Sequence, residues 1–132
     1  MPEPESSMDE LAALVGVALE GGDLSSFAAL LDPDVTWGAP GARRPSCRNR
    51  DQVLAWYEKG REAGVRARVN DVNVHGDKIL VSLVVGGSPA GQERGGEALR
   101  WQVLTVRRGR VVDIVGFDDR NDALAEAGVA GP

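Results

Sequence analysis

Hydrophobic positions in the first half of the chain recur every three or four residues in three segments. Side chains at this spacing share one face of a helix, which predicts helices over residues 8–20, 24–31 and 51–62. Gly21 and Gly22 end the first helix, and Asp32 with Pro33 ends the second. Between the second and third helices, "DVTW" alternates polar and apolar residues, which predicts a short strand over residues 34–37.

From Val65 onward the hydrophobic period changes to two, as in half-buried strands. The alternation shifts phase at Asp71, which predicts a bulge there. "HGDK" and "RRGR" are expected to be tight turns, and a glycine-rich loop is expected over residues 86–96. An alanine-rich segment over residues 120–127 predicts a last helix, which Gly128 ends. The strands predicted between these signals cover residues 65–74, 79–85, 98–106 and 111–117.

The order of these elements is helix, helix, strand, helix, four strands, helix. Consecutive strands joined by short turns pair in antiparallel fashion, and the helices grouped ahead of them are expected on one face of the sheet. The sequence therefore predicts an α+β fold built on an antiparallel sheet. At 132 residues the chain is expected to form a single domain over residues 8–128, between a disordered tail at 1–7 and a C-terminal tail at 129–132.

Composition narrows the class of protein. A net charge of −5 argues against a nucleic-acid partner, because nucleic-acid binders usually carry a basic face. No apolar run approaches the ~20 residues that span a bilayer, and the polar N-terminus lacks the regions of a secretory signal. A cytoplasmic location without membrane contact is therefore expected. One cysteine and one histidine argue against a zinc site, which needs about four nitrogen or sulfur ligands.

Three stretches carry a resemblance to a known family. "LLDPDVTW" follows the first two predicted helices, "NRDQVLAWYEKG" opens the third, and "RWQVLTVRRGRVVDIVGFDD" forms the final predicted hairpin. With the order of elements over residues 8–127, they resemble the SnoaL-like group of the nuclear transport factor 2-like superfamily. The resemblance implies a curved sheet that forms a cone around a cavity, with the N-terminal helices closing its mouth. It also implies a homodimer formed through the outer face of the sheet.

Members of this superfamily include isomerases, cyclases, dehydratases and epoxide hydrolases, as well as proteins that only bind or scaffold. The fold alone therefore does not decide between an enzyme and a binding module. The side chains that face the cavity determine whether a member of this fold is an enzyme or a binding module.

Aromatic side chains are the candidate ligand-binding residues. A pocket that they line would suit a flat apolar ligand, although aromatic residues at helix or strand spacing usually belong to the core. Trp37, which ends the first predicted strand, and Trp56, on the third helix, are best placed by the resemblance to line the cavity. The full set is Trp37, Trp56, Tyr57, Trp101 and Phe117.

Polar residues of the last hairpin are the candidate catalytic groups, namely Arg100, Gln102, Asp113 and Asp118. Isomerases of this fold use an aspartate base against an oxyanion-stabilising donor. One of the two aspartates would then move the proton, and the arginine or the glutamine would stabilise negative charge. Epoxide hydrolases of this fold use an Asp–Arg–Asp arrangement. The position of its strand aspartate falls here on Gly116 or, in another alignment, on Val115, which argues against that mechanism.

Asp113 is the aspartate that no local rule explains. Simple alternation places it on an otherwise apolar face of its strand with Val111, Val115 and Phe117. Its carboxylate is then buried with a partner such as Arg100 across the hairpin, exposed near a strand edge, or the acid or base of a pocket.

Asp118 and Asp119 have a simpler interpretation, because they directly precede the last predicted helix. One of them stands where an N-cap belongs, and Asp122 lies in the first turn, where the helix dipole favours a carboxylate. His75 at a predicted turn and Cys47 in a polar loop are not expected to be catalytic.

Two hypotheses follow. In the first, the chain performs acid–base chemistry (isomerisation, cyclisation or dehydration) on a small hydrophobic substrate, without a metal or organic cofactor. In the second, it is a ligand-binding or dimerisation module without enzymatic activity, and the aromatic residues belong to its core. A carboxylate facing into a cavity would favour the first hypothesis.

Overall fold

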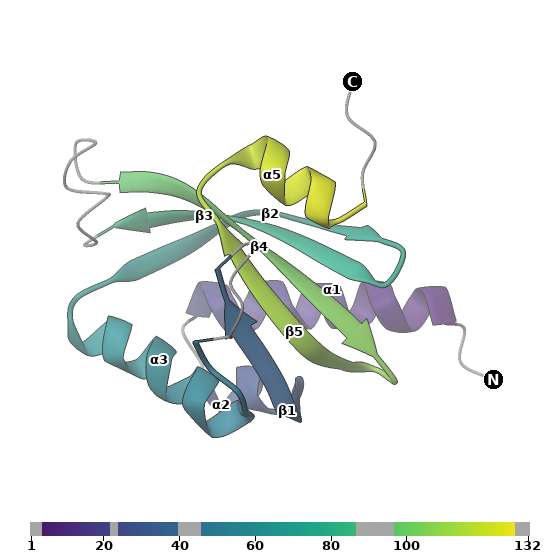
Figure 1. The fold of residues 1–132 in the computed structure, drawn as a ribbon, viewed down its shortest axis with the longest axis horizontal. Helices are drawn as coiled ribbons and strands as arrows, with labels where there is room; N and C mark the ends of the chain where they lie inside the picture. Colours follow the sequence, from purple (N-terminus) through teal and green to yellow (C-terminus); the bar gives the residue numbers. More distant parts are fainter. Residues whose placement is uncertain (1–3, 22–23, 40–45, 87–96, 129–132) are drawn as a thin grey trace.

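The computed structural model describes residues 4–21, 24–39, 46–86 and 97–128 (Figure 1). Residues 1–3 of the predicted tail at 1–7, residues 87–96 of the predicted loop at 86–96 and the predicted tail at 129–132 lie outside the described residues, whereas residues 4–7 belong to a helix. The element order is the predicted one. It comprises α1 (Pro4–Gly21), α2 (Leu24–Ala28), β1 (Leu31–Gly38), α3 (Arg50–Glu62), β2 (Arg66–His75), β3 (Lys78–Gly86), β4 (Glu97–Arg107), β5 (Arg110–Phe117) and α5 (Arg120–Glu126).

The five strands form one curved sheet in the order β1-β5-β4-β3-β2 (Figure 1). Strands β2 to β5 form an antiparallel meander, as the short turns between them predict. Strand β1 joins the far edge and runs parallel to β5. The α+β class is therefore confirmed, with one parallel pair added to the antiparallel sheet.

Helices lie on both faces of this sheet (Figure 1). Helix α1 crosses the face that we call the inner face, and the larger core lies there, between the sheet and the helices α1, α2 and α3. Its fully buried residues include Val15, Val35, Val53, Ile79, Leu104 and Ile114. Helix α5 covers part of the outer face, where a smaller core gathers around Val103, Phe117 and Ala123.

Three element boundaries differ from the prediction by more than one residue, namely the start of α1, the end of α2 and the start of β1. Helix α1 begins at Pro4 instead of Met8, and proline suits a first turn because the N–H that it lacks has no partner within the helix there. Helix α2 ends at Ala28, and the chain enters β1 at Leu31. Pro33 is accommodated within β1 because β1 is an edge strand, which needs hydrogen bonds on only one side.

The predicted bulge in β2 is present, as the register with β3 shifts between Val69 and Asp71. The predicted turn between β4 and β5 is also present. Arg108 and Gly109 both adopt positive φ, 54° and 77°, as a two-residue type I′ turn requires. No helix among the described residues is long and apolar enough to cross a membrane.

A second bulge, in β5, overturns part of the predicted alternation. Val111 pairs with Val106 and Asp113 pairs with Thr105, which leaves Val112 as the extra residue. Val111 therefore joins the inner core instead of sharing a face with Asp113. Beyond the bulge the alternation holds, because Val115 and Phe117 pack in the outer core.

Candidate functional site

Helix α3 carries Trp56 and Tyr57, and a reciprocal cap fixes its start. Asn49 Oδ1 accepts a hydrogen bond from the backbone N–H of Gln52 at 2.9 Å, and Gln52 Oε1 accepts one from the N–H of Arg48 at 2.8 Å. Each bond satisfies an amide that the helix itself leaves unpaired. The cap thereby fixes where the helix begins, and so which of its residues face the sheet.

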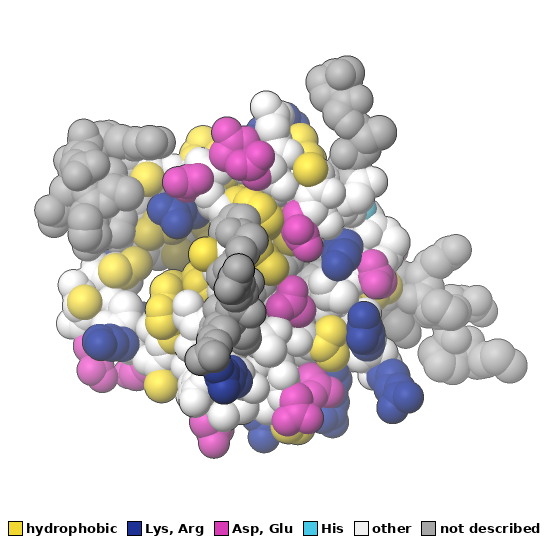
Figure 2. Space-filling model, viewed as in Figure 1, with side chains coloured by type: hydrophobic (Ala, Val, Ile, Leu, Met, Phe, Trp, Pro, Cys, Tyr) yellow, Lys and Arg dark blue, Asp and Glu magenta, His cyan; other side chains and the backbone are white. Residues whose placement is uncertain are grey.

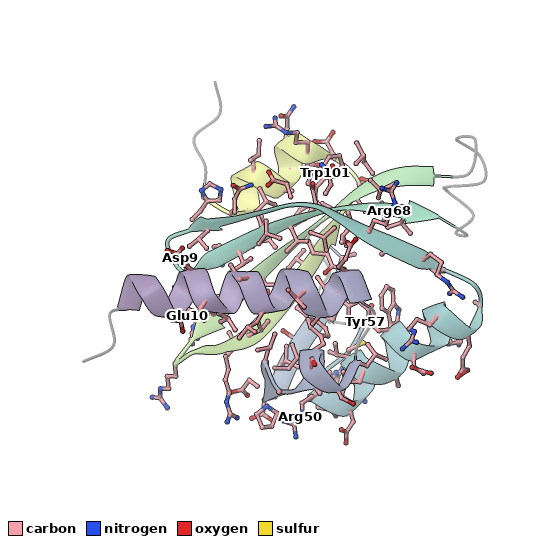
Figure 3. The ribbon with its side chains drawn as sticks, turned by 180° about the vertical axis from the view of Figure 1, so that it is seen from behind. Asp9, Glu10, Arg50, Tyr57, Arg68 and Trp101 are labelled. Carbon is pink, nitrogen blue, oxygen red and sulfur yellow. The ribbon has the colours of Figure 1, made fainter. Side chains whose placement is uncertain are left out.

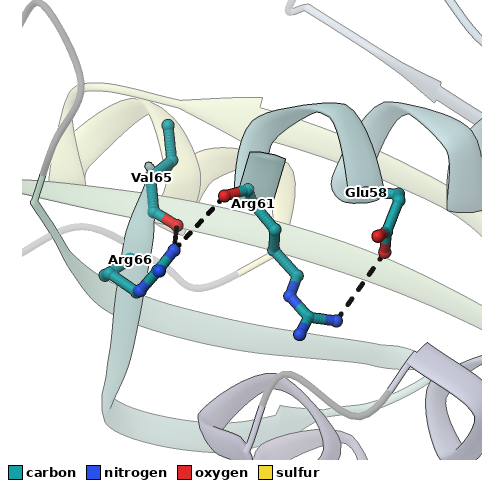
Figure 4. A network of polar contacts seen from close by, with 4 residues as sticks. All are labelled: Glu58, Arg61, Val65 and Arg66. Carbon is teal, nitrogen blue, oxygen red and sulfur yellow. Dashed lines mark hydrogen bonds and ion pairs between the residues drawn. The ribbon is translucent and has the colours of Figure 1, made fainter. Parts of the chain in front are cut away.

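The end of α3 is fixed just as locally. Gly64 has a φ of 93°, and the N–H of Val65 donates to the carbonyl of Gly60 at 2.9 Å, which is the Schellman arrangement. The guanidinium of Arg66 then donates to the carbonyls of Arg61 and Val65 (Figure 4). The ion pair between Arg61 and Glu58 in the same view is exposed at 3.7 Å and adds little, because solvent screens it.

Four of the predicted site residues meet on the inner face, from three different elements. The indole N–H of Trp37 on β1 donates to the hydroxyl oxygen of Tyr57 on α3 at 3.2 Å. The hydroxyl of Tyr57 donates to Oε1 of Gln102 on β4, also at 3.2 Å. The ring of Trp56 lies 4.3 Å from the ring of Trp37, tilted by 32°. We call Trp37, Trp56, Tyr57 and Gln102 the aromatic–amide cluster.

Trp37 is held in the cluster by its backbone and by its ring. Its N–H and carbonyl exchange two 3.0 Å hydrogen bonds with Cys47, which bridges the end of β1 to the segment before α3. Its indole packs on Gly116, where an added Cβ would lie 3.2 Å from a ring carbon. A glycine inside a strand often marks such a close approach of another group to the backbone.

Tyr57 lies at the centre of the cluster, between α1 and α3 below the sheet (Figure 3). Phe27 of α2 packs edge-on against its ring with 5.3 Å between the ring centres, a contact between two helices that no local sequence pattern predicts. Burial raises the pKa of Tyr57 to about 12, and the hydrogen bonds to Trp37 and Gln102 partly oppose this rise. The phenol is therefore neutral at physiological pH and acts as a hydrogen-bond relay.

The members of the cluster differ in their exposure to solvent. Gln102 is 7% exposed and Tyr57 and Trp37 are partly buried, whereas Trp56 is 45% exposed. The half-exposed indole of Trp56 thus offers an apolar surface next to the rings of Trp37 and Tyr57. The prediction that aromatic residues are mostly core thus does not describe Trp56.

The other two candidate aromatic residues lie on the outer face. Trp101 pairs in register with Phe117, and both pack in the smaller core with Ala123 and Ala127. Trp101 lies above the sheet beside α5, on the opposite side from Tyr57 (Figure 3). The structure does not bring these two side chains together with the aromatic–amide cluster.

Asp113 also belongs to the outer face. Its neighbours across the sheet are Thr36 on one side and Thr105 on the other, and Oδ1 accepts a hydrogen bond from the hydroxyl of Thr36 at 2.5 Å. The suggested pairing with Arg100 is wrong, because Asp113 lies opposite Thr105 of β4 on the outer face, whereas Arg100 lies opposite Leu83, whose side chain belongs to the inner core. This arrangement gives Asp113 a structural role in joining β1 to β5.

The remaining candidate catalytic residues are exposed. Asp118 follows the end of β5, and Asp119 is the N-cap of α5, with Oδ1 accepting from the N–H of Asp122 at 3.0 Å. Arg100 alternates onto the same face as Gln102 but is exposed near the start of β4. The predicted catalytic set is therefore dispersed, and of its four members only Gln102 belongs to the cluster.

A separate open groove of about 580 Å³ lies between α1 and β2. It is lined by Ala12, Ala13, Gly16, Val17, Glu20, Val69 and Val72. Among the described residues that line it, Glu20 supplies the polar side chain, and its carboxylate accepts a hydrogen bond from the backbone N–H of Val69. None of the predicted site residues lines this groove. Within the described ranges, no three His, Cys, Asp or Glu side chains are grouped closely enough to share a metal ion.

Figure 2 shows the side of the molecule seen in Figure 1, toward which the outer face of the sheet is turned. Hydrophobic side chains gather over the left half of this view, and charged side chains dominate the right and lower parts. Leu99 of β4 is 46% exposed on this face and pairs in register with Val84.

Several solved structures share this fold. A proposed ketosteroid isomerase from Kribbella flavida has a TM-score of 0.70 at 20% identity, over 87% of this chain and 79% of that chain. A proposed polyketide cyclase from Sinorhizobium meliloti has a TM-score of 0.64 at 24% identity, over 83% and 97%. An LEH-like epoxide hydrolase from M. tuberculosis has a TM-score of 0.62 at 15% identity, over 94% of this chain and 90% of that chain.

At these identities the likeness concerns the fold alone, which is shared with nuclear transport factor 2-like proteins. No curated protein matches the sequence. The family model of the SnoaL-like domain matches residues 11–114, which is most of the chain and includes β1, α3 and the strands that carry the cluster. The chain therefore belongs to the SnoaL-like domain family.

Proposed function

We propose that this protein binds a small, flat, largely apolar molecule at the aromatic–amide cluster. The observation that carries the proposal is the half-exposed indole of Trp56 stacked on Trp37, directly beside the hydrogen-bonded Tyr57 and Gln102. Small-molecule sites typically combine apolar and aromatic walls with a few well-placed polar groups. The membership of a family whose fold hosts small-molecule chemistry supports the proposal without naming a ligand.

Energetics favour an occupant for Trp56. Leaving a large apolar side chain in water costs about 25 cal/mol for each Å² that a ligand would cover. Stacking an aromatic molecule on an indole adds about 1 kcal/mol beyond this area effect. A ligand that covers the exposed part of Trp56 thus gains affinity from both sources.

The structure supports ligand binding better than it supports catalysis in which one of the predicted aspartates acts as the acid or base. Asp113 hydrogen-bonds Thr36 on the outer face, and Asp119, next to Asp118, caps α5. A general base needs to lie within hydrogen-bond reach of the proton that it removes. A molecule at the cluster would be separated from Asp113 by the sheet, so turnover through that carboxylate is not part of the proposal.

The experiment is a titration with bicyclic aromatic probes, followed by Trp fluorescence and by thermal shift. We expect the wild-type chain and a Leu14→Ala control on the exposed side of α1 to bind the same probes with equal affinity. Trp56→Ala should weaken binding at least fivefold, because it removes the stacking surface. Equal affinities in the Trp56→Ala variant and the wild type would refute the proposed site.

The homodimer through the outer face stays a prediction. The half-exposed Leu99 on the outer face is consistent with such a contact. Sedimentation of the wild type should give a dimer, and Leu99→Lys should give a monomer. The matched variant Leu14→Lys, on α1, should remain dimeric, and the opposite pattern would place the contact on α1 instead.

A further inference from the structure

Helix α1 is apolar on every side along its middle. Residues 11–19 read LAALVGVAL, a run of about two and a half turns without a polar side chain. A helix that meets water along one side normally carries polar residues there, whereas a helix that is apolar all round is normally covered all round. Val15 packs in the inner core, but Val17 is 71% exposed. The exposed side of α1 therefore has the composition of a covered surface.

Val17 also lines the open groove between α1 and β2. Ala13, Gly16 and Val17 belong to the wall that α1 provides, and Val69 and Val72 form the wall that β2 provides. Gly16 allows the helix to lie close to the strand, because a Cβ there would be 3.3 Å from a methyl carbon of Val72. The groove, of about 580 Å³, thus offers a partner mostly apolar contacts.

Acidic side chains stand at both ends of this surface. Asp9 and Glu10 lie near the N-terminal end of α1 (Figure 3), and Glu20 lines the groove at the other end. Glu10 and Glu20 are separated by about 15 Å along the helix axis. Arg68, which precedes Val69 in β2, lies with Trp101 on the opposite side of the sheet (Figure 3).

This arrangement of charge favours a partner that is basic at both ends. Such a partner is attracted at each end of the groove. A second copy of α1 would bring glutamates against glutamates, whether the two helices ran parallel or antiparallel. An anionic membrane surface would likewise be repelled.

The backbone of β2 favours a helical partner over an extended one. β2 is an edge strand, and an extended peptide would add to it through backbone hydrogen bonds. However, the N–H of Val69 already donates to the carboxylate of Glu20. The N–H of Val72 donates to Oδ1 of Asp71 at 3.0 Å, and the bulge between Val69 and Asp71 interrupts the edge. A helix satisfies its own backbone hydrogen bonds and needs only the apolar walls.

We propose that the groove between α1 and β2 docks an amphipathic helix of a partner protein, with an apolar face and a basic residue at each end of that face. The apolar face covers Val17 and enters the groove, and the two basic side chains reach Glu10 and Glu20. Helix-in-groove docking is a recurring mode of peptide recognition. The groove is separate from the aromatic–amide cluster, so this inference goes beyond the proposed function and can fail without it.

The test is a calorimetric titration with two end-capped peptides, each stapled on the face away from its leucines so that it stays helical. The basic peptide is AKAQLLQALAQKA, and the acidic peptide, AEAQLLQALAQEA, has glutamates in place of the lysines. The wild type should bind the basic peptide roughly tenfold more tightly at low salt, and added salt should shrink this ratio by screening the exposed charges. No binding of the basic peptide below about 1 mM would overturn the proposal.

Variants separate the apolar contribution from the charged one. Val17→Gln should weaken both peptides by roughly threefold or more, because it removes apolar contact area. Leu14→Gln changes another exposed apolar side chain of α1 that does not line the groove, and should keep the wild-type affinity. Glu10→Gln combined with Glu20→Gln, which keeps an oxygen acceptor at position 20, should largely remove the preference for the basic peptide. Glu62→Gln at the exposed end of α3 should retain that preference.

Three results would overturn the proposal even if the basic peptide binds. They are equal affinity of the wild type for the two peptides, equal losses in Val17→Gln and Leu14→Gln, and a change of oligomeric state in Val17→Gln. The last, measured by sedimentation, would show that the groove is a contact between copies of this chain. Binding of bicyclic aromatic probes should be unchanged in Val17→Gln, which keeps this test distinct from that of the proposed function at Trp56.

Discussion

The indole of Trp37 occupies the space that any side chain at position 116 would need. A Cβ on Gly116 would lie 3.2 and 3.3 Å from two carbons of that ring, closer than nearly all ordinary contacts of a Cβ. Trp37 belongs to β1 and Gly116 to β5, so the pair packs two parallel neighbouring strands at the inner face. A carboxylate side chain at position 116 would press on the indole, which gives a physical reason why glycine suits this position.

This contact predicts that the effect of Gly116→Val on the free energy of unfolding changes sign when Trp37 is also replaced. Gly116→Val should destabilise the wild type by about 2 kcal/mol, because the valine collides with the indole. In a Trp37→Leu background the same change should be neutral or stabilising, since the space is then open and valine favours strands. Urea denaturation of the four proteins measures both effects. Additive free energies of unfolding would show that the two residues do not compete for space.

Tyr57 predicts a specific loss of stability at high pH. The folded protein holds the phenolic proton more tightly than the unfolded chain, because burial raises the pKa of Tyr57 from 10.0 to about 12. The stabilisation is fully present below pH 10 and is lost as the pH rises from 10 to 12. The wild type should therefore lose about 2 kcal/mol relative to Tyr57→Phe across this range.

Denaturation of both proteins at several pH values measures that difference. Cys47, whose pKa burial also raises, titrates in both proteins and largely cancels. Parallel stability curves from pH 9 to 12 would mean that Tyr57 is not held in the buried relay.

The bond between Thr36 and Asp113 predicts a structural effect without a functional one. Asp113→Ala and Thr36→Val should each cost about 1 kcal/mol, and the double variant should cost less than their sum, because both remove the same hydrogen bond. Affinity for bicyclic probes should not change in any of the three. Loss of probe binding in a folded Asp113→Ala variant would restore this aspartate as a site residue.

Asp118 and Asp119, which precede α5, are predicted to contribute differently to the stability of the protein. Asp119→Ala removes the bond to the N–H of Asp122 and should lower the free energy of unfolding by about 1 kcal/mol. Asp118→Ala, one residue earlier, serves as the matched control and should change it by less than about 0.5 kcal/mol. If Asp118→Ala lowered the free energy of unfolding more than Asp119→Ala does, Asp118 and not Asp119 would be the N-cap of α5. Thermal or urea denaturation suffices for this comparison.

The fold was accessible from the sequence because local patterns determine most of it. The change of hydrophobic period at Val65, the bulge at Asp71 and the Arg108–Gly109 turn all depend on neighbouring residues and are confirmed. The cap of α5 was likewise narrowed to two adjacent aspartates, and the structure assigns it to Asp119.

The candidate site was harder to predict from the sequence, because contacts between residues far apart in the chain determine which side chains come together. The bulge in β5 depends on how two strands pair, and it moved Val111 to the inner face. The partner of Asp113 comes from β1, 77 positions away in the chain, and no pattern within the final hairpin points to it. Trp56 and Trp101 are both aromatic residues at regular spacing. Only the assembled sheet separates the half-exposed indole on α3 from the one packed beside α5.

The most direct measurement of the central claim is an NMR titration of the three tryptophan indole N–H signals with 1-indanone. The signals of Trp37 and Trp56 belong to the proposed site, and the signal of Trp101, on the opposite face, serves as an internal control. Binding at the aromatic–amide cluster predicts that the first two signals shift and saturate together while the third stays in place. A shift of Trp101 alone, or no shift of Trp37 and Trp56 at saturating probe, would contradict it.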